Sequence, residues 1–275
     1  MTKTYDLTTG SLAKHFMRLA VPAAIGMVFS TLYNVVDVFF AGMIGTDAQA
    51  GLAISFQAFF IFVTIGFGLS AAMTALVGNA IGAKKTTDAS IIAAQGIGFS
   101  IVTSVLLIVA ARFIGPHLLA IISTEGAYRT AGEAYFMILI LSLPGFIMGY
   151  GLNGILQAQG DTVSMQYALI GAFFANIGLN PLMMFGIPGI WGGLGFDGIA
   201  AATVISQTGV MVYIGFRLMR SGLLDAKTLN NILPNLALYR QILAQLLPTT
   251  FTMLVMFTAG FIVQFYLKTF GTPAV

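Results

Sequence analysis

One carboxylate lies alone inside an apolar stretch near the start of the chain: Asp37 is the only charged residue between positions 19 and 44. Placing a charge near the centre of a lipid bilayer costs roughly 2.5 to 3.5 kcal/mol, so such a residue needs a compensating partner or a functional role. Packing between helices does not require a charge. The position therefore predicts a functional acid rather than a structural one.

Neutral polar side chains at helical spacing accompany this acid on four apolar stretches. On the first stretch Ser30, Tyr33 and Asn34 share a helix face with Asp37. The other three stretches carry Tyr150, Asn153 and Gln157, then Asn176 and Asn180, and then Thr203, Ser206 and Gln207. Interhelical hydrogen bonding, worth roughly 0.6 kcal/mol on average, explains any one of these groups taken singly. Taken together, they predict polar helix faces that line the acid.

The sequence lacks the residues that most catalytic and metal sites use. It has no Cys and only two histidines, His15 and His117. No apolar stretch holds a Ser/His/Asp set, a pair of catalytic carboxylates or a cluster of metal ligands. The net charge is +3, but the basic residues form no run of the kind that binds nucleic acid. We therefore expect no enzyme, no catalytic residue, no cofactor and no nucleic-acid partner.

The composition predicts the elements that position these residues. Hydrophobic residues make up 58% of the chain and charged residues 8%, against about 25% charged residues in soluble domains. A spanning helix needs about 20 mostly apolar residues, whereas barrel strands are short and alternating. The predicted spans are 17–44, 51–81, 89–113, 130–158, 163–187, 198–219 and 241–270. The sequence thus predicts an all-α polytopic membrane protein with seven helices.

The placement of the basic residues predicts the orientation. An N-terminus in the cytoplasm puts nine of the twelve Lys and Arg residues inside, which the positive-inside rule favours. These nine are Lys3, Lys14, Arg18, Lys84, Lys85, Arg217, Arg220, Lys227 and Arg240, and Arg112, Arg129 and Lys268 lie outside. We expect a multi-pass protein of the cytoplasmic (inner) membrane. Glu133 and Asp161 lie near span ends, where solvent or headgroups can solvate them.

An internal repeat predicts the domain organisation. With an offset of 226, Pro22 aligns with Pro248, Met27 with Met253, Phe39 with Phe265, Gly45-Thr46 with Gly271-Thr272 and Ala48 with Ala274. The seventh helix therefore repeats the first, as in transporters built by duplication. We expect a six-helix lobe at 1–220, a cytoplasmic linker at 221–239 and the first helix of a truncated second lobe at 240–275. The partner is then the missing second lobe, and the protein is otherwise a monomer in membrane lipid.

Glycine and proline predict where helices pack closely and where they bend. Gly145-x-x-x-Gly149, with Gly151 and Gly154, allows close approach of neighbouring helices. Pro22, Pro144 and Pro181 are predicted to bend their spans, although Pro22 begins its span, where proline is tolerated without a kink.

The sequence resembles the multidrug and toxic compound extrusion (MATE) family over nearly its whole length. The resemblance rests on P-A-A-I-G-M and S-T-L-Y-N-V-V-D within 22–37, Q-A-x-G-D at 157–161, N-I-G-L-N-P-L-M-M-F-G at 176–186 and G-I-A-A-A-T-V-I-S-Q at 198–207. It implies half of a twelve-helix, two-lobe transporter that opens alternately to the two sides. It also implies export of small cationic or amphipathic compounds against entry of protons or sodium.

The resemblance also implies a cation-coupling site in this lobe. The matching positions are Asp37, Asn176, Asn180 and Thr203, with Tyr33, Asn34, Asn153, Gln157 and Gln207 as cavity or supporting residues. Asn180 departs from the family, which usually has aspartate there. An amide oxygen can ligate sodium but carries no titrating proton, so only one carboxylate is left for coupling.

Several alternatives remain at this point. Sodium held by Asp37, Asn176, Asn180 and Thr203 and a proton on Asp37 explain coupling equally well, because oxygen ligands suit a hard cation. A lipid-linked sugar flippase of the same superfamily is a second function, although the spans carry no basic residue clear of their ends for a pyrophosphate. A non-transporting truncated remnant is a third.

Overall fold

The structure is a computed structural model that describes residues 11–224, 228 and 230–270. Within these ranges the chain forms a bundle of long helices, with one isolated β-bridge between Ile187 and Trp191. The helices are α1 (Leu12–Ile44), α2 (Thr46–Gly82), α3 (Thr86–Ile122), α4 (Ala127–Leu139), α5 (Leu143–Ala158), α6 (Ser164–Phe185), α7 (Asp197–Met219) and α9 (Leu236–Leu267). Short 3-10 turns lie at Ile140–Ser142, Asn230–Ile232 and Lys268–Phe270.

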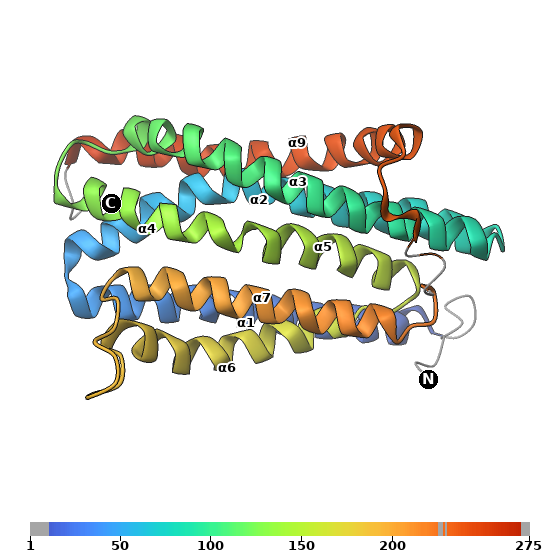
Figure 1. Cartoon of the computed structure of the whole chain (residues 1–275), viewed down its shortest axis with the longest axis horizontal. Helices are drawn as coiled ribbons and strands as arrows, with labels where there is room; N and C mark the ends of the chain where they lie inside the picture. The colour runs from blue at the N-terminus through green and yellow to red at the C-terminus, as the bar shows by residue number, and fades with distance from the viewer. Residues whose placement is uncertain (1–10, 225–227, 229, 271–275) are drawn as a thin grey trace.

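Seven segments of the described residues are long and apolar enough to cross a membrane. Six are the helices α1 to α3, α6, α7 and α9, and the seventh combines α4 with α5. The prediction of an all-α polytopic membrane protein is confirmed. The α2–α3 turn, the α5–α6 turn and the end of α7 lie at one end of the bundle (Figure 1). The cytoplasmic placement of this end stays a prediction.

Pro144 lies where the fourth span changes geometry. Proline has no N–H group to donate to the carbonyl one turn back, so the α-helical hydrogen-bond ladder is interrupted there. The chain forms a 3-10 turn at Ile140–Ser142, and Pro144 then occupies the first turn of α5. By contrast, α1 continues as helix through Pro22 and α6 through Pro181. The bends predicted at these two prolines stay predictions.

Helix α5 occupies the middle of the bundle, between α1, α6 and α7 on one side and α2, α3 and α9 on the other (Figure 1). Its glycines allow this position. A Cβ atom at Gly145 would lie 2.8 Å from the backbone of Gln207, and one at Gly154 would lie 2.3 Å from the carbonyl oxygen of Ser70. The predicted close approach of helices at these two glycines is confirmed.

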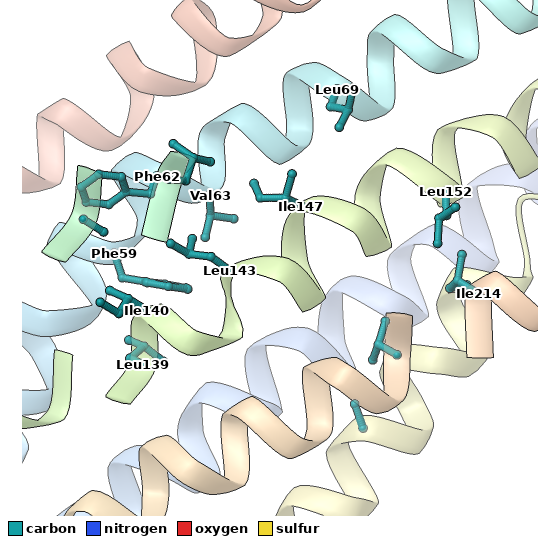
Figure 2. Close-up of a cluster of buried hydrophobic side chains, with 14 of the residues drawn as sticks. Phe59, Phe62, Val63, Leu69, Leu139, Ile140, Leu143, Ile147, Leu152 and Ile214 are labelled. Carbon is teal, nitrogen blue, oxygen red and sulfur yellow. The ribbon is translucent and has the colours of Figure 1, made fainter. Parts of the chain in front are cut away.

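The largest apolar side chains of the core lie where α2 meets the fourth span. Phe59, Phe62 and Val63 of α2 pack against Leu139 and Leu143 from the other segment (Figure 2). In a bilayer the lipid tails are as apolar as these side chains, so van der Waals packing rather than water exclusion holds such helices together. This contact fixes α4 and α5 against α2.

Helix α9 begins at Leu236, inside the segment 221–239 that the sequence predicts as linker. The side chain of Asn235 explains the earlier start, because its oxygen accepts hydrogen bonds from the backbone N–H groups of Ala237 and Leu238 at 3.0 and 3.3 Å. Pro22 lies inside α1 and Pro248 inside α9, and the internal repeat stays a prediction. The aligned residues 271–274 lie outside the described residues.

Candidate cation site and adjoining cavity

Asp37 of α1 is fully buried and faces α6 and α7. Asn180 of α6 donates a 2.8 Å hydrogen bond from Nδ2 to one carboxylate oxygen. Thr203 of α7 donates a 3.3 Å hydrogen bond from Oγ1 to the other oxygen. The acid is therefore held by neutral donors from two neighbouring helices.

Asn176 completes the arrangement one helical turn before Asn180. Because residues four apart share a helix face, Asn180 Nδ2 also reaches Asn176 Oδ1, at 3.0 Å. Asn176, Asn180 and Thr203 are as fully buried as Asp37. The structure thus brings together the four residues that the resemblance implies as a cation-coupling site.

The turn between α6 and α7 sets the register that faces Thr203 toward Asn180. Gly198, at the start of α7, lies so close to α6 that a Cβ atom there would be 2.6 Å from the backbone of Met183. Gly193 has a φ of 76°, and its Cβ atom would lie 2.3 Å from the carbonyl oxygen of Met184. Only glycine adopts this conformation at this separation without strain. Helices α6 and α7 are therefore in close contact from the first turn of α7 onward.

Several polar atoms around the site have no hydrogen-bond partner among the described residues. They are Tyr33 Oη, Tyr135 Oη, Asn176 Nδ2, Asn180 Oδ1 and Ser206 Oγ. Burying an unpaired polar group is costly, so native proteins rarely leave several together without a role for them. The unpaired oxygens among these atoms can accept a hydrogen bond or coordinate a hard cation.

Tyr135 of α4 belongs to this site, although sequence reasoning did not select it. Its side chain is fully buried, and its phenol lies close enough to Asp37 and Tyr33 to interact with both electrostatically. Its ring stacks on Phe196 at 4.9 Å between ring centroids. A tyrosine in an apolar span carries no periodic signal, and only the fold brings it near the acid.

No ion pair among the described residues compensates Asp37. In residues 11–224, 228 and 230–270 the two ion pairs are Arg129 with Glu133 and Arg217 with Asp161. The same ranges contain no group of three or more His, Cys, Asp and Glu residues that could hold a metal ion. A single carboxylate with neutral oxygens suits a proton or a monovalent cation better than a divalent one, because it supplies only one compensating charge.

A cavity of about 100 Å³ adjoins the acid. Its aromatic wall comes from α2 and α5 and comprises Phe56, Phe60, Phe67, Phe146 and Tyr150. Its polar wall comes from α1 and α7 and includes Tyr33 and Thr203, but Asp37 itself does not line it. None of the lining residues is charged. Tyr33 and Thr203 thus form part of the wall between the acid and the cavity.

The predicted supporting residues divide into two groups. Tyr33, Asn34 and Gln207 line the cavity, together with Ser30. Asn153 is buried in α5 but lies outside the lining, and its side-chain oxygen has no partner among the described residues. Gln157 is exposed near the end of α5 and does not line the cavity, and its supporting role stays a prediction.

Asp161 is held much more tightly than a solvated acid at a span end. It accepts hydrogen bonds from the backbone and side chain of Ser164 at 3.0 and 2.6 Å, and from Val163 N at 3.2 Å. Arg217 at the end of α7 pairs with it at 2.9 Å. Partial burial by itself raises the pKa of Asp161, but these hydrogen bonds outweigh it and hold the pKa below its usual value. The contacts join the α5–α6 turn to α7.

The seven spans, the buried acid and the uncharged cavity define a polytopic helical membrane protein with an internal polar site. The sequence profile of the MatE family matches residues 22–182, which include Asp37, Asn176 and Asn180. The chain belongs to the MatE family, and the resemblance recognised from its motifs is confirmed.

Two curated relatives and one solved structure show the extent of the similarity. The probable multidrug resistance protein NorM of Thermotoga maritima is 26% identical over 78% of this chain and 48% of its own length. The multidrug export protein MepA of Staphylococcus saprophyticus is 20% identical over 98% and 59%, respectively. A solved MOP superfamily transporter from Pyrococcus furiosus shares the fold with a TM-score of 0.79 and 24% identity, covering 92% of this chain and 55% of that one.

The chain therefore spans about half the length of the curated relatives that it matches. The names of these relatives describe transport and drug resistance rather than enzymatic chemistry, in agreement with the expectation that the chain is not an enzyme.

Proposed function

We propose that this chain is the amino-terminal lobe, with the first helix of the second lobe, of an antiporter that exports cationic or amphipathic compounds. Entry of a proton or sodium ion at Asp37 drives the export. The observation that carries the proposal is the position of this single buried acid. It lies behind a wall that includes Tyr33 and Thr203, next to an uncharged aromatic cavity.

Asp37 alternates between a free and a loaded state in this proposal. In the free state the amide N–H of Asn180 and the hydroxyl of Thr203 stabilise the carboxylate. A proton neutralises the acid directly. Sodium requires the Asn180 amide to turn, so that its unpaired Oδ1 joins the carboxylate and Asn176 Oδ1 as ligands. Loading removes the negative charge that these donors compensate.

The cavity supplies part of the substrate site, because its volume of about 100 Å³ is smaller than the roughly 300 Å³ or more that a drug-sized ligand occupies. Aromatic faces attract organic cations by cation–π interaction and bind apolar groups by contact, without the desolvation cost of a fixed counter-charge. Phe67 and Tyr150 both line the cavity, with 4.5 Å between their ring centroids and an angle of 42° between their planes. Asn34 and Gln207 add hydrogen-bonding groups on the opposite wall. This combination favours flat, amphipathic monovalent cations.

Coupling between ion and substrate passes through the residues shared by both sites. Loading Asp37 frees the hydroxyl of Thr203, and Tyr33 lies one helical turn from Asp37 on α1. A shift of either side chain changes the cavity wall directly. The substrate is therefore released when the acid is loaded, with no ion pair between them. The lobe alternates between the two sides of the cytoplasmic membrane, with the N-terminus in the cytoplasm.

The cavity composition disfavours the flippase alternative. A pyrophosphate group requires Arg or Lys side chains, which supply charge-assisted hydrogen bonds. The lining of this cavity contains neither residue. Recognition of a lipid-linked sugar by this lobe alone therefore has no visible basis.

Ion-driven efflux of a fluorescent organic cation from vesicles that hold the complete transporter tests the proposal. We expect efflux to stop in Asp37→Asn and to persist in Asp47→Asn, a matched control at an exposed position on α2. Efflux from Asp37→Asn vesicles at the rate of the native protein would contradict the proposed role of Asp37. Absence of efflux in the native protein would favour the non-transporting remnant.

A further inference from the structure

Gln95 is a buried polar residue that the cation site and the cavity do not use. It lies on α3 and is 3% exposed. Helices α2 and α3 have 37 residues each, about 55 Å of helix, whereas the hydrocarbon core is about 30 Å thick. Their hairpin projects beyond the ends of α5 and α7 (Figure 1). Gln95 lies three turns into this hairpin from the α2–α3 turn.

The side-chain amide of Gln95 binds three backbone groups of the segment that leads into α9. Its Nε2 donates to the carbonyl oxygen of Leu233 at 2.7 Å and also to that of Asn231. Its Oε1 accepts from the backbone N–H of Asn235 at 2.9 Å. Both amide hydrogens and the oxygen are thus used by one short stretch of backbone. Burial of this polar side chain is explained by these bonds alone.

Two neighbours on α3 extend the contact. A Cβ atom at Gly98 would lie 2.2 Å from the carbonyl oxygen of Ile232, so glycine is required for the segment to approach this closely. Phe99 meets Tyr239 of α9 edge to face, with 5.1 Å between ring centroids. The segment 230–239 therefore rests on α3 along its length.

We propose that Gln95 is a positioning residue that fixes the inter-lobe segment 230–235 to the α2–α3 hairpin. The residue it binds, Asn235, is also the one whose side chain caps the start of α9. The start of α9 is therefore anchored to the first lobe. If the second lobe moves as in the proposed function, α9 pivots about this end. The anchoring itself does not depend on transport.

Spin-label distance measurements on the 275-residue chain test the anchoring. The sequence has no Cys, so Thr87→Cys and Asn230→Cys place two labels at exposed positions on the hairpin and the segment, with no background. We expect one narrow distance distribution in the native chain. Gln95→Leu removes all three bonds, and a released polar linker samples a wide range of distances. The width should grow by about two-fold or more.

A matched control and a second variant make the result decisive. Ser104→Ala removes a buried hydroxyl of α3 that bonds only to Ser100 within the helix, and it should leave the width unchanged. Gly98→Val retains Gln95, but its side chain forces the segment 230–235 away from α3 at Ile232. This variant should also broaden the distance distribution. A native width in both Gln95→Leu and Gly98→Val, with helical content retained, would overturn the proposal.

Discussion

The amide nitrogen of Asn180 lies 2.8 Å from the carboxylate of Asp37, where its N–H group compensates the buried charge. The MATE family usually has aspartate at this position, which would add a second negative charge instead. The asparagine thus stabilises the unloaded carboxylate without a cation. It also leaves Asp37 as the one titrating group among the four site residues.

Asn180→Asp should make the site depend on sodium or protons for its stability. The variant removes the donor to Asp37 and places two carboxylates together, so we expect the unloaded chain to lose more than about 2 kcal/mol of stability at neutral pH. Thermal unfolding in detergent, with and without sodium, measures the effect. Sodium should raise the midpoint more in Asn180→Asp than in the native chain. An equal response in both, with Asn230→Asp as surface control, would contradict this role.

Thr203→Val should strengthen ion binding and leave the cavity shape intact. Valine keeps the volume of threonine but removes the hydroxyl that lies 3.3 Å from Asp37. Because this hydroxyl stabilises the unloaded carboxylate, its loss predicts an increase of about 1 kcal/mol, or about five-fold, in the apparent ion affinity. Thr208→Val, on an exposed face of α7, serves as the control because its hydroxyl bonds only to Val204. Equal ion affinities in the two variants would contradict the role of Thr203 in stabilising the unloaded acid.

Phe67→Leu should distinguish an aromatic substrate site from a merely apolar one. Leucine retains hydrophobic contact but loses the ring face beside Tyr150. We expect the affinity for a cationic dye to decrease by about 1 kcal/mol, while a neutral dye of the same shape is less affected. Fluorescence titration of the purified chain measures both affinities. Phe39→Leu, whose ring is exposed on α1, should change neither. A parallel decrease for both dyes in Phe67→Leu would exclude the cation–π contribution.

The contact between Asp161 and Arg217 should make the stability of the folded chain depend on pH in the acidic range. Because hydrogen bonds hold the pKa of Asp161 below its usual value in the folded chain, its contribution is present above the unfolded pKa, about 4. The contribution is lost as the pH falls through the lower folded pKa. The native midpoint should therefore fall more than that of Asp161→Asn between about pH 5 and pH 3. Parallel curves for the two proteins would show that the pair contributes nothing.

The sequence was sufficient to predict the site residues whose polar or charged side chains are costly to bury in a membrane. Asp37, Asn176, Asn180 and Thr203 stand out because polar groups in apolar spans need partners, and the motifs that resemble the family contain all four. The position of Gln157 outside the cavity lining could not be predicted, because helical periodicity assigns a face but does not show how far along the helix a neighbour extends. Its position near the end of α5 is exposed.

Tertiary contacts explain what periodicity could not predict. Tyr135 reaches the site only because α4 packs against α7, and nothing in its sequence neighbourhood marks it. The earlier start of α9 depends on the cap at Asn235 and on its hydrogen bond to Gln95, which is 140 residues away in the chain. Long-range contacts of this kind have no periodic signal.

Infrared difference spectroscopy of the purified chain tests the loading of Asp37 most directly. Acidification should produce the C=O stretch of a protonated carboxylic acid in a dry environment, and sodium should suppress this band if the two ions compete for one site. We expect the band in the native chain and in Asp47→Asn, and its absence in Asp37→Asn. The same band in Asp37→Asn would show that another group takes up the proton and would contradict the account.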